Sequence, residues 1–124
     1  MKAIHTDKAP KALGPYSQAI LSGSNLYISG QIAINPATGT MVVDTIENEA
    51  TQIMNNIEAI LEAARLNFSF VVKTTIFVTD IAYFDAVNSV YAKYFKENPP
   101  ARSFVQVAGL PKGAHVEIET LAIR

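Results

Sequence analysis

Two apolar segments near the start of the chain predict a β-hairpin. They are "YSQAIL" at residues 16–21 and "NLYISGQIAI" at residues 25–34, and the polar "SGSN" between them is typical of a hairpin loop. Because side chains alternate between the faces of a strand, the second segment has two predicted faces. One face carries Tyr27, Ser29 and Gln31, and the other carries Leu26, Ile28 and Gly30. We expect residues 16–34 to form an antiparallel pair.

The spacing of apolar residues then predicts an amphipathic helix over residues 46–65. Asp44 followed by Glu47 resembles the capping box that begins many helices, and the polar "RLNFS" segment interrupts the pattern at its end. The apolar positions recur every three or four residues, at Ile53, Ile57, Ile60, Leu61 and Ala64.

The second half of the chain predicts a strand, a helix and two further strands. "FVVKTTIFVTD" at residues 70–80 is rich in β-branched residues, and Asp80 can cap the helix that follows. Pro99 and Pro100 stop that helix, after which come "RSFVQVA" and "HVEIETLAIR", joined by "GLPKG". The apolar stripe of the helix consists of Phe84, Val87, Tyr91, Tyr94 and Phe95.

This order, β-β-α-β-α-β-β, predicts an α+β fold with a single mixed sheet and both helices on one face. The 124 residues, 49% of them hydrophobic, are enough for one domain over residues 1–124. Two helices cannot cover both faces of the sheet. We expect the second, moderately apolar face to pack against another copy of the chain, and subunit interfaces often contain pockets.

Composition narrows the possible functions. Ten Lys and Arg against eleven Asp and Glu give a formal charge of -1, so nucleic acid is not favoured as a partner. The chain has no cysteine, and its two isolated histidines, His5 and His115, do not predict a metal site. Neither a signal peptide nor a membrane-spanning segment is recognisable, so we expect a cytoplasmic protein without a membrane anchor.

Charged residues within the last two strands raise the question of chemistry. Alternation puts Glu117 and Glu119 on one face, about 7 Å apart along the strand, while Arg102 begins the preceding strand. These residues could simply face water or form surface ion pairs. They could also form a site in which the planar guanidinium binds a small carboxylate and a glutamate acts as a general base. The residues alone leave both interpretations open.

Five segments together resemble the signature blocks of the RidA family, also called the YjgF family, of enamine/imine deaminases. The resemblance extends over essentially the whole chain, in order and with matching spacing. The blocks are "GPYSQA" at 14–19, "SGQI" at 29–32, "VNSVYAKYF" at 87–95, "PARSFVQV" at 100–107 and "LPKGAHVEIETLA" at 110–122.

The resemblance implies a chorismate mutase-like fold, a homotrimer with pockets at the subunit interfaces, and no metal or organic cofactor. It also implies hydrolysis of 2-imino acids such as 2-iminopropanoate to 2-keto acids and ammonia. Arg102 would bind the substrate carboxylate, and Glu117 would hold the attacking water. Tyr16, Ser29, Gly30 and Asn88 fall on pocket-lining positions, and the backbone at Phe104 would contact the substrate.

Two positions depart from the family pattern. Phe104 stands where a cysteine is common, and Ala33 stands where "SGQI" is usually followed by proline. Phe104 makes a second function credible, a regulatory module that binds small carboxylates without strong catalysis. A third, a translation-inhibiting ribonuclease, is not favoured because the chain has no basic stripe and no predicted histidine pair or metal site.

Overall fold

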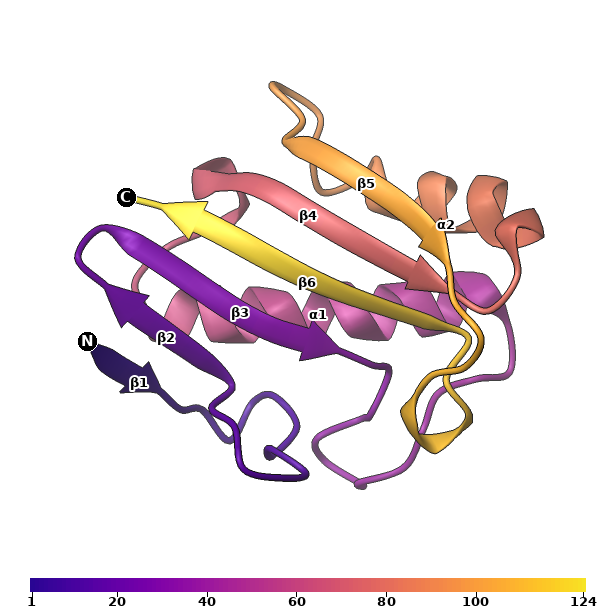
Figure 1. Ribbon diagram of the computed structural model, residues 1–124, viewed down its shortest axis with the longest axis horizontal. Coiled ribbons are helices and arrows are strands. Elements are labelled where there is room, and N and C mark those ends of the chain that lie inside the picture. Colours follow the sequence, from indigo (N-terminus) through magenta and orange to yellow (C-terminus); the bar gives the residue numbers. More distant parts are fainter.

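The computed structural model describes residues 1–124 as one mixed sheet with both helices behind it (Figure 1). This confirms the α+β arrangement expected from the order of the elements. The elements are β1 (Lys2–Ile4), β2 (Ala19–Ser22), β3 (Asn25–Gln31), α1 (Ile46–Ala63), β4 (Val71–Val78), α2 (Phe84–Tyr91), β5 (Ala101–Gln106) and β6 (Val116–Ile123).

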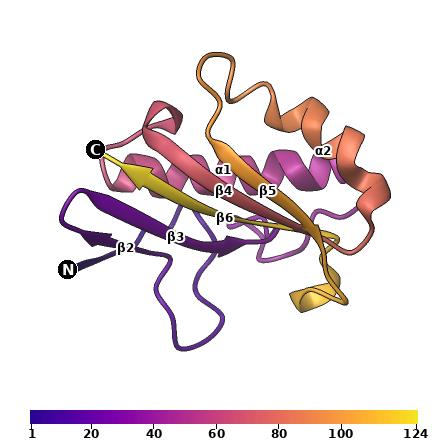
Figure 2. The ribbon, with the colours of Figure 1, turned by 45° about the horizontal axis from the view of Figure 1, so that its top comes forward.

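The strand order across the sheet is β1-β2-β3-β6-β4-β5, so the last strand of the chain lies inside the sheet. Every neighbouring pair is antiparallel except β4 and β5, which run parallel and are connected through α2. Figure 2 shows α1 running behind the strands and α2 lying beyond β4 and β5. The charged segments therefore occupy different places, because β6 is central and β5 is an edge strand.

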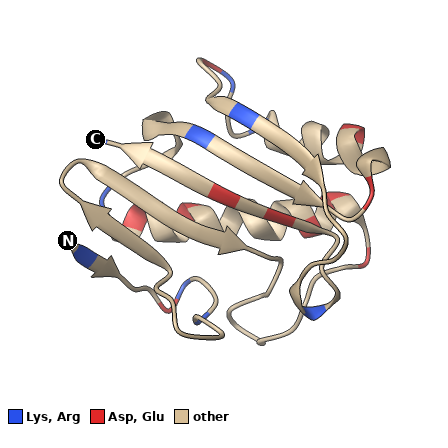
Figure 3. Cartoon of the chain, in the orientation of Figure 1, with Lys and Arg blue, Asp and Glu red and all other residues tan.

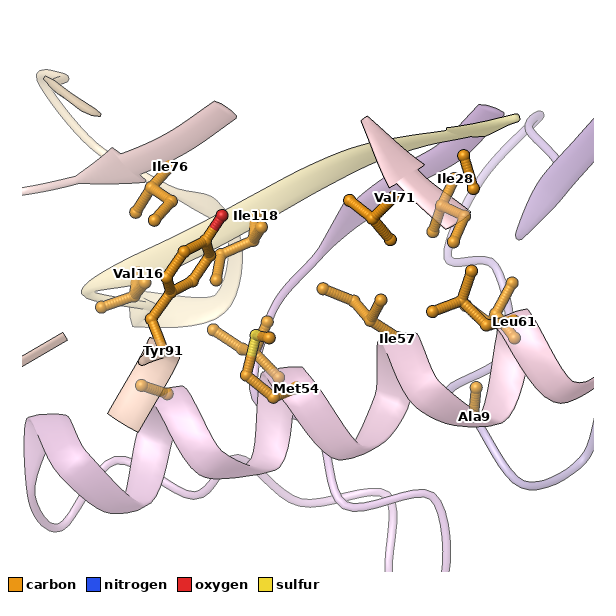
Figure 4. Close-up of a cluster of buried hydrophobic side chains, with 14 of the residues drawn as sticks. Ala9, Ile28, Met54, Ile57, Leu61, Val71, Ile76, Tyr91, Val116 and Ile118 are labelled. Carbon is orange, nitrogen blue, oxygen red and sulfur yellow. The ribbon is translucent and has the colours of Figure 1, made fainter. Parts of the chain in front are cut away.

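The core lies between α1 and the helix-covered face of the sheet, as Figure 4 shows. Met54, Ile57 and Leu61 project from α1 towards Ile118 and Ile28 of the sheet. Ile53, Ile57, Ile60 and Leu61 are at most 1% exposed, which confirms the predicted apolar stripe. Each such side chain contributes about 1.5–3 kcal/mol by leaving water, so this face of α1 fixes the helix on the sheet.

Several element ends differ from the sequence prediction. Thr45, rather than the expected Asp44, caps α1, because its hydroxyl accepts the backbone N–H of Asn48 at 3.0 Å. α1 ends at Ala63 instead of residue 65, since Arg65 adopts a left-handed conformation with φ of 62°. α2 stops at Tyr91, short of the prolines, and Asp80 caps a 3-10 turn (Ile81–Tyr83) that leads into it.

The N-terminal part of the sheet also differs from the sequence prediction. The short strand β1 was not predicted, and β2 begins at Ala19 rather than at residue 16. β3 ends at Gln31 rather than at residue 34, and its pairing with β6 shifts register between Ile28 and Gln31. This irregularity breaks the alternation assumed from the sequence and turns Gly30 towards Glu117, away from the face of Ile28.

The face of the sheet away from the helices, here called the open face, is uncovered in the single chain. It includes exposed apolar side chains at Tyr27, Val105 and Ile123, which are 49%, 39% and 41% exposed. Glu117 and Glu119 also project from this face, since they alternate along β6 with buried Val116 and Ile118. No helix of the chain is both long and apolar enough to cross a bilayer.

Candidate functional site

A cleft of about 530 Å³ opens on the open face beside β3 and β6. Its walls come from the segment before β2, the end of β3 and the start of β6. Of the residues predicted for the site, it brings together Tyr16, Ser29, Gly30 and Glu117, with Glu119 at its side. These residues are far apart in the sequence and meet because β6 pairs with β3.

Glu117 is the chemically distinctive group of this cleft. Burial raises the pKa of its carboxyl above the ordinary value, and the nearby Glu119 carboxylate raises this pKa further. The Glu117 carboxylate lies directly against Gly30, where a Cβ atom would overlap its Oε1. Glycine is therefore needed at position 30 for close approach, and φ there is not in the left-handed region. A carboxyl group that gives up its proton less readily in water-restricted surroundings suits proton transfer.

Hydrogen bonds hold the other walls of this cleft. The Ser29 hydroxyl donates to the carbonyl of Ser17 at 2.6 Å, which ties β3 to the preceding segment. The Tyr16 hydroxyl accepts the backbone N–H of Leu13 at 3.0 Å, while the side chain remains 48% exposed. Both hydroxyl groups therefore line the cleft with fixed positions.

Arg102 lies elsewhere, on the face of β5 that looks towards α2. Its guanidinium donates from Nη1 to Oδ1 of Asn88 at 2.7 Å and lines a smaller cavity of about 350 Å³. The Asn88 and Arg102 positions predicted from the sequence are thus brought together. No carboxylate of the chain lies within salt-bridge distance of Arg102.

Within one chain, the two predicted catalytic residues lie on opposite faces of the sheet. Arg102 pairs in register with Thr74 of β4, whose buried hydroxyl bonds the hydroxyl of Tyr91 in α2 at 2.8 Å. Glu117 pairs with Phe77 and projects from the open face. The chain therefore carries two half-sites, defined here as the Glu117 half-site (Tyr16, Ser29, Gly30, Glu117) and the Arg102 half-site (Asn88, Arg102, Phe104).

Phe104 belongs to the Arg102 half-site through its side chain as well as its backbone. It lies two residues after Arg102 on the same face of β5 and contacts the ring of Phe84 edge-on, with centroids 4.9 Å apart. Because β5 is an edge strand, one side of its backbone has no strand partner. Its unpaired backbone groups are free to bond a ligand or another subunit.

The sequence prediction missed the pairing of Glu49 with His115. Glu49 of α1 is fully buried, and its carboxylate accepts the backbone N–H groups of His115 and Val116 at 2.7 and 2.9 Å. Its other oxygen lies 2.8 Å from Nδ1 of His115. This contact fixes the start of β6 immediately before Glu117. A glutamate inside the apolar stripe of the predicted helix was the signal that could have found it.

Charge is otherwise dispersed over the molecule. Figure 3 shows the acidic positions of β6 near the middle of the sheet, with basic positions scattered and no continuous stripe. No group of three or more His, Asp or Glu residues is arranged to hold a metal ion. His115 is engaged by Glu49, and His5 lies 3.2 Å from Asp7.

Comparisons with known proteins agree with the expected fold. The sequence model of the family described as Endoribonuclease L-PSP matches residues 6–124. The 2-iminobutanoate/2-iminopropanoate deaminase of Homo sapiens is 50% identical over 123 residues, covering 99% of this chain and 90% of that protein. The crystal structure of YyfA from Yersinia pestis, described as a protein of the conserved Rid family, superimposes with a TM-score of 0.97.

That structure is 51% identical and covers 99% of this chain and 98% of its own. The structure of TdcF from E. coli with bound serine gives a TM-score of 0.96 at 40% identity, covering 100% of this chain and 99% of the other. Similarity of this extent, over the whole sheet and both half-sites, establishes that the chain belongs to the RidA/YjgF family.

Proposed function

We propose that the protein hydrolyses reactive 2-imino acids and their enamine tautomers, such as 2-iminopropanoate, to 2-keto acids and ammonia. The proposal is supported by the name of the human relative, 2-iminobutanoate/2-iminopropanoate deaminase, at 50% identity. It is also supported by the two kinds of group that such a reaction needs. One is a cation free to bind a carboxylate, and the other is a carboxyl group able to move a proton.

The observation that carries the proposal is the separation of these groups on opposite faces of the sheet. Arg102 has no carboxylate partner in its own chain, and Glu117 has a raised pKa with no cation beside it. A second copy of the chain, packed on the exposed apolar residues of the open face, could bring its Arg102 half-site to the Glu117 half-site. We propose a homotrimer, in which each pocket lies between two subunits.

In such a pocket, Arg102 would bind the substrate carboxylate through two parallel N–H···O bonds and so fix the imine carbon. Glu117, as carboxylate, would accept a proton from a water molecule while the water oxygen bonds to that carbon. The imine reacts in its protonated form, so its carbon–nitrogen double bond becomes a single bond and a tetrahedral carbinolamine with an uncharged amine forms. Protonated Glu117 would then give the proton to the amine nitrogen. As the carbon–nitrogen bond breaks, ammonia leaves, the hydroxyl group becomes the carbonyl of the 2-keto acid, and the hydroxyl proton passes to the Glu117 carboxylate.

Positioning is the main contribution required from the protein, because imines already react with water. A Glu117 carboxylate with a raised pKa accepts a proton from the attacking water more readily than an ordinary carboxylate would. Tyr16, Ser29 and the backbone at Gly30 would line the pocket, and the backbone at Phe104 would contact the substrate from the other subunit. A single domain over residues 1–124 and a cytoplasmic location remain predictions from the sequence.

Turnover tests this proposal directly. The imine would be generated freshly from an amino acid, and release of the keto acid would be followed with and without the protein, across imines from several amino acids. Faster release than in buffer, by a protein that light scattering shows to be a trimer, is expected. Tight binding of a keto acid without acceleration would instead favour the regulatory module, and a stable monomer at micromolar concentration would contradict the interface pocket.

A further inference from the structure

Three aromatic rings surround the guanidinium of Arg102. Its Cζ atom lies 5.0 Å from the centroid of Tyr91 and 5.6 Å from those of Phe84 and Phe104. These distances are within the range of cation–π attraction. We name these three residues the aromatic cradle.

The cradle follows from the spacing of its residues. Phe84, Asn88 and Tyr91 are four and three positions apart in α2, so they share one face of the helix. Arg102 and Phe104 are two positions apart in β5, so they share one face of the strand. Packing α2 against β5 therefore brings all five side chains together.

Each ring of the cradle is itself held in place. The Tyr91 hydroxyl is bonded to Thr74 at 2.8 Å, and the Tyr91 ring packs on Phe95 with centroids 4.7 Å apart. Phe104 contacts Phe84 edge-on at 4.9 Å. The three rings therefore restrict the Arg102 side chain, which would otherwise rotate about several bonds.

The hydrogen bonds of Arg102 show what this arrangement leaves free. A guanidinium has five N–H donors, and the structure gives one to Asn88 and none to a carboxylate. Rings around the cation accept no strong hydrogen bonds, so the remaining donors stay available for a ligand. An arginine whose position is fixed, but whose paired N–H donors are not hydrogen-bonded, is preorganised to bind a carboxylate in one orientation.

We propose that the aromatic cradle is a positioning device for Arg102, and that Phe104 sets how tightly the protein holds a substrate carboxylate. The inference rests on the proposed function for its substrate, a 2-imino acid, but not for its binding measurement. Phe104 is a positioning residue because its ring acts through Arg102. Its removal lowers affinity and leaves the chemical step, which depends on Glu117, unchanged.

Phe104→Leu and Phe104→Tyr test the proposal, because the first keeps an apolar side chain without a ring and the second keeps the ring. Pyruvate, a small 2-keto acid, is the binding probe, measured by calorimetry, and the KM and kcat of imine hydrolysis are measured beside it. Phe104→Leu is expected to raise both the pyruvate Kd and the KM about two- to fivefold, as loss of one cation–π contact implies. The kcat of Phe104→Leu should stay at the wild-type value. In Phe104→Tyr, both the pyruvate Kd and the KM should stay close to those of the wild type.

Phe70→Leu is the matched control, since Phe70 packs on the core and lines none of the site cavities. A thermal melt identifies a variant that loses its fold, and Phe84→Leu then replaces Phe104→Leu, because Phe84 is 42% exposed. In an Arg102→Lys background, Phe104→Leu should have no further effect, since the fork that the cradle orients is gone. An added loss there would mean that the Phe104 ring contacts the ligand directly, and would overturn the positioning role.

Unchanged Kd and KM in folded Phe104→Leu would overturn the proposal, as would an equal loss in Phe104→Tyr or a fall in kcat alone. Failure of the proposed function has a different signature. A wild-type protein that hydrolyses no imine, yet binds pyruvate more tightly than Phe104→Leu does, would refute the deaminase and leave the cradle supported. A wild-type protein that neither turns over imines nor binds pyruvate would refute both.

Discussion

Two inactive variants should regain activity when their chains are mixed, because Arg102 and Glu117 lie on opposite faces of one sheet. Arg102→Lys keeps the charge but loses the two-pronged geometry, which costs on the order of 2 kcal/mol, or roughly thirtyfold in kcat/KM. Glu117→Gln can hydrogen-bond a water molecule but cannot accept its proton. Each variant alone should therefore form trimers in which every pocket is defective.

The size of the recovery follows from counting subunits. In a random equal mixture, a pocket between two chains has an intact Arg102 about half of the time and an intact Glu117 from its neighbour about half of the time. About a quarter of the pockets are then complete, and activity should return to about a quarter of the wild-type value. If both residues served one pocket within a single chain, no pocket in this mixture would be complete.

A second mixture serves as the control. Wild-type chains mixed equally with chains that carry both substitutions should also give about a quarter of the activity if the pockets lie between subunits. They should give about a half if each chain contains its own pocket. The chains would carry different affinity tags, so that capture by both tags verifies that mixed trimers have formed, and keto-acid release is measured on the unfractionated mixture, to which these fractions apply. Verified mixed trimers of the single variants that stay inactive would refute the shared pocket.

Further predictions concern the Glu117 half-site and its support. Gly30→Ala should fold but displace the Glu117 carboxylate, and imine hydrolysis should fall as far as in Glu117→Gln; a wild-type rate would contradict the contact. Glu119→Gln should change the free energy of unfolding by less than about 0.5 kcal/mol and should change the rate little. Because the Glu119 charge helps to raise the pKa of Glu117, the acid limb of the pH–rate profile should move to lower pH. An activity loss equal to that of Glu117→Gln would show that the wrong carboxylate was assigned. The pKa of Glu117 is raised in the folded state, so ionisation of Glu117 opposes folding. At pH values above this raised pKa, melting curves should therefore show Glu117→Gln to be more stable than wild type. The difference in stability should disappear below the unfolded pKa of about 4.3. Glu49→Gln should lower the free energy of unfolding by about 1–3 kcal/mol in urea, compared with exposed Glu47→Gln as the control; equal stability of the two variants would refute the role of the buried carboxylate.

The fold was predictable from the sequence where a pattern was long and uniform. The stripe from Ile53 to Leu61 and the alternation around Ile118 each repeat over several turns or residues, and both faces were assigned correctly. β1 has only three residues, too few for a period to show. Gly30 was placed on the wrong face because an irregularity in strand pairing depends on the partner strand, which local alternation does not contain.

Arg102 and the glutamates of β6 were singled out by their charge within apolar strands, while their roles and the other site residues came from the family resemblance. The arrangement of these residues could not be read from the chain. Nothing in the spacing of Arg102 and Glu117 indicates that they face opposite sides, because β5 and β6 are separated in the sheet by β4. Glu49 was overlooked for a related reason. Its partners at the start of β6 are 66 and 67 residues away and become neighbours only when α1 packs on the sheet.

Gln18 bears on how the cleft beside Glu117 behaves as acidity changes. Its buried side-chain amide accepts the backbone N–H of Thr6 at 2.8 Å and donates to the carbonyls of Thr6 and Pro10 at 3.0 and 2.8 Å. A carboxylate could not make this set of bonds, since it has no N–H to donate. An amide also carries no charge at any ordinary pH. The segment before β2 that lines the cleft is therefore held by hydrogen bonds to a side chain that does not titrate. It can stay in place while Glu117 gains and loses its proton.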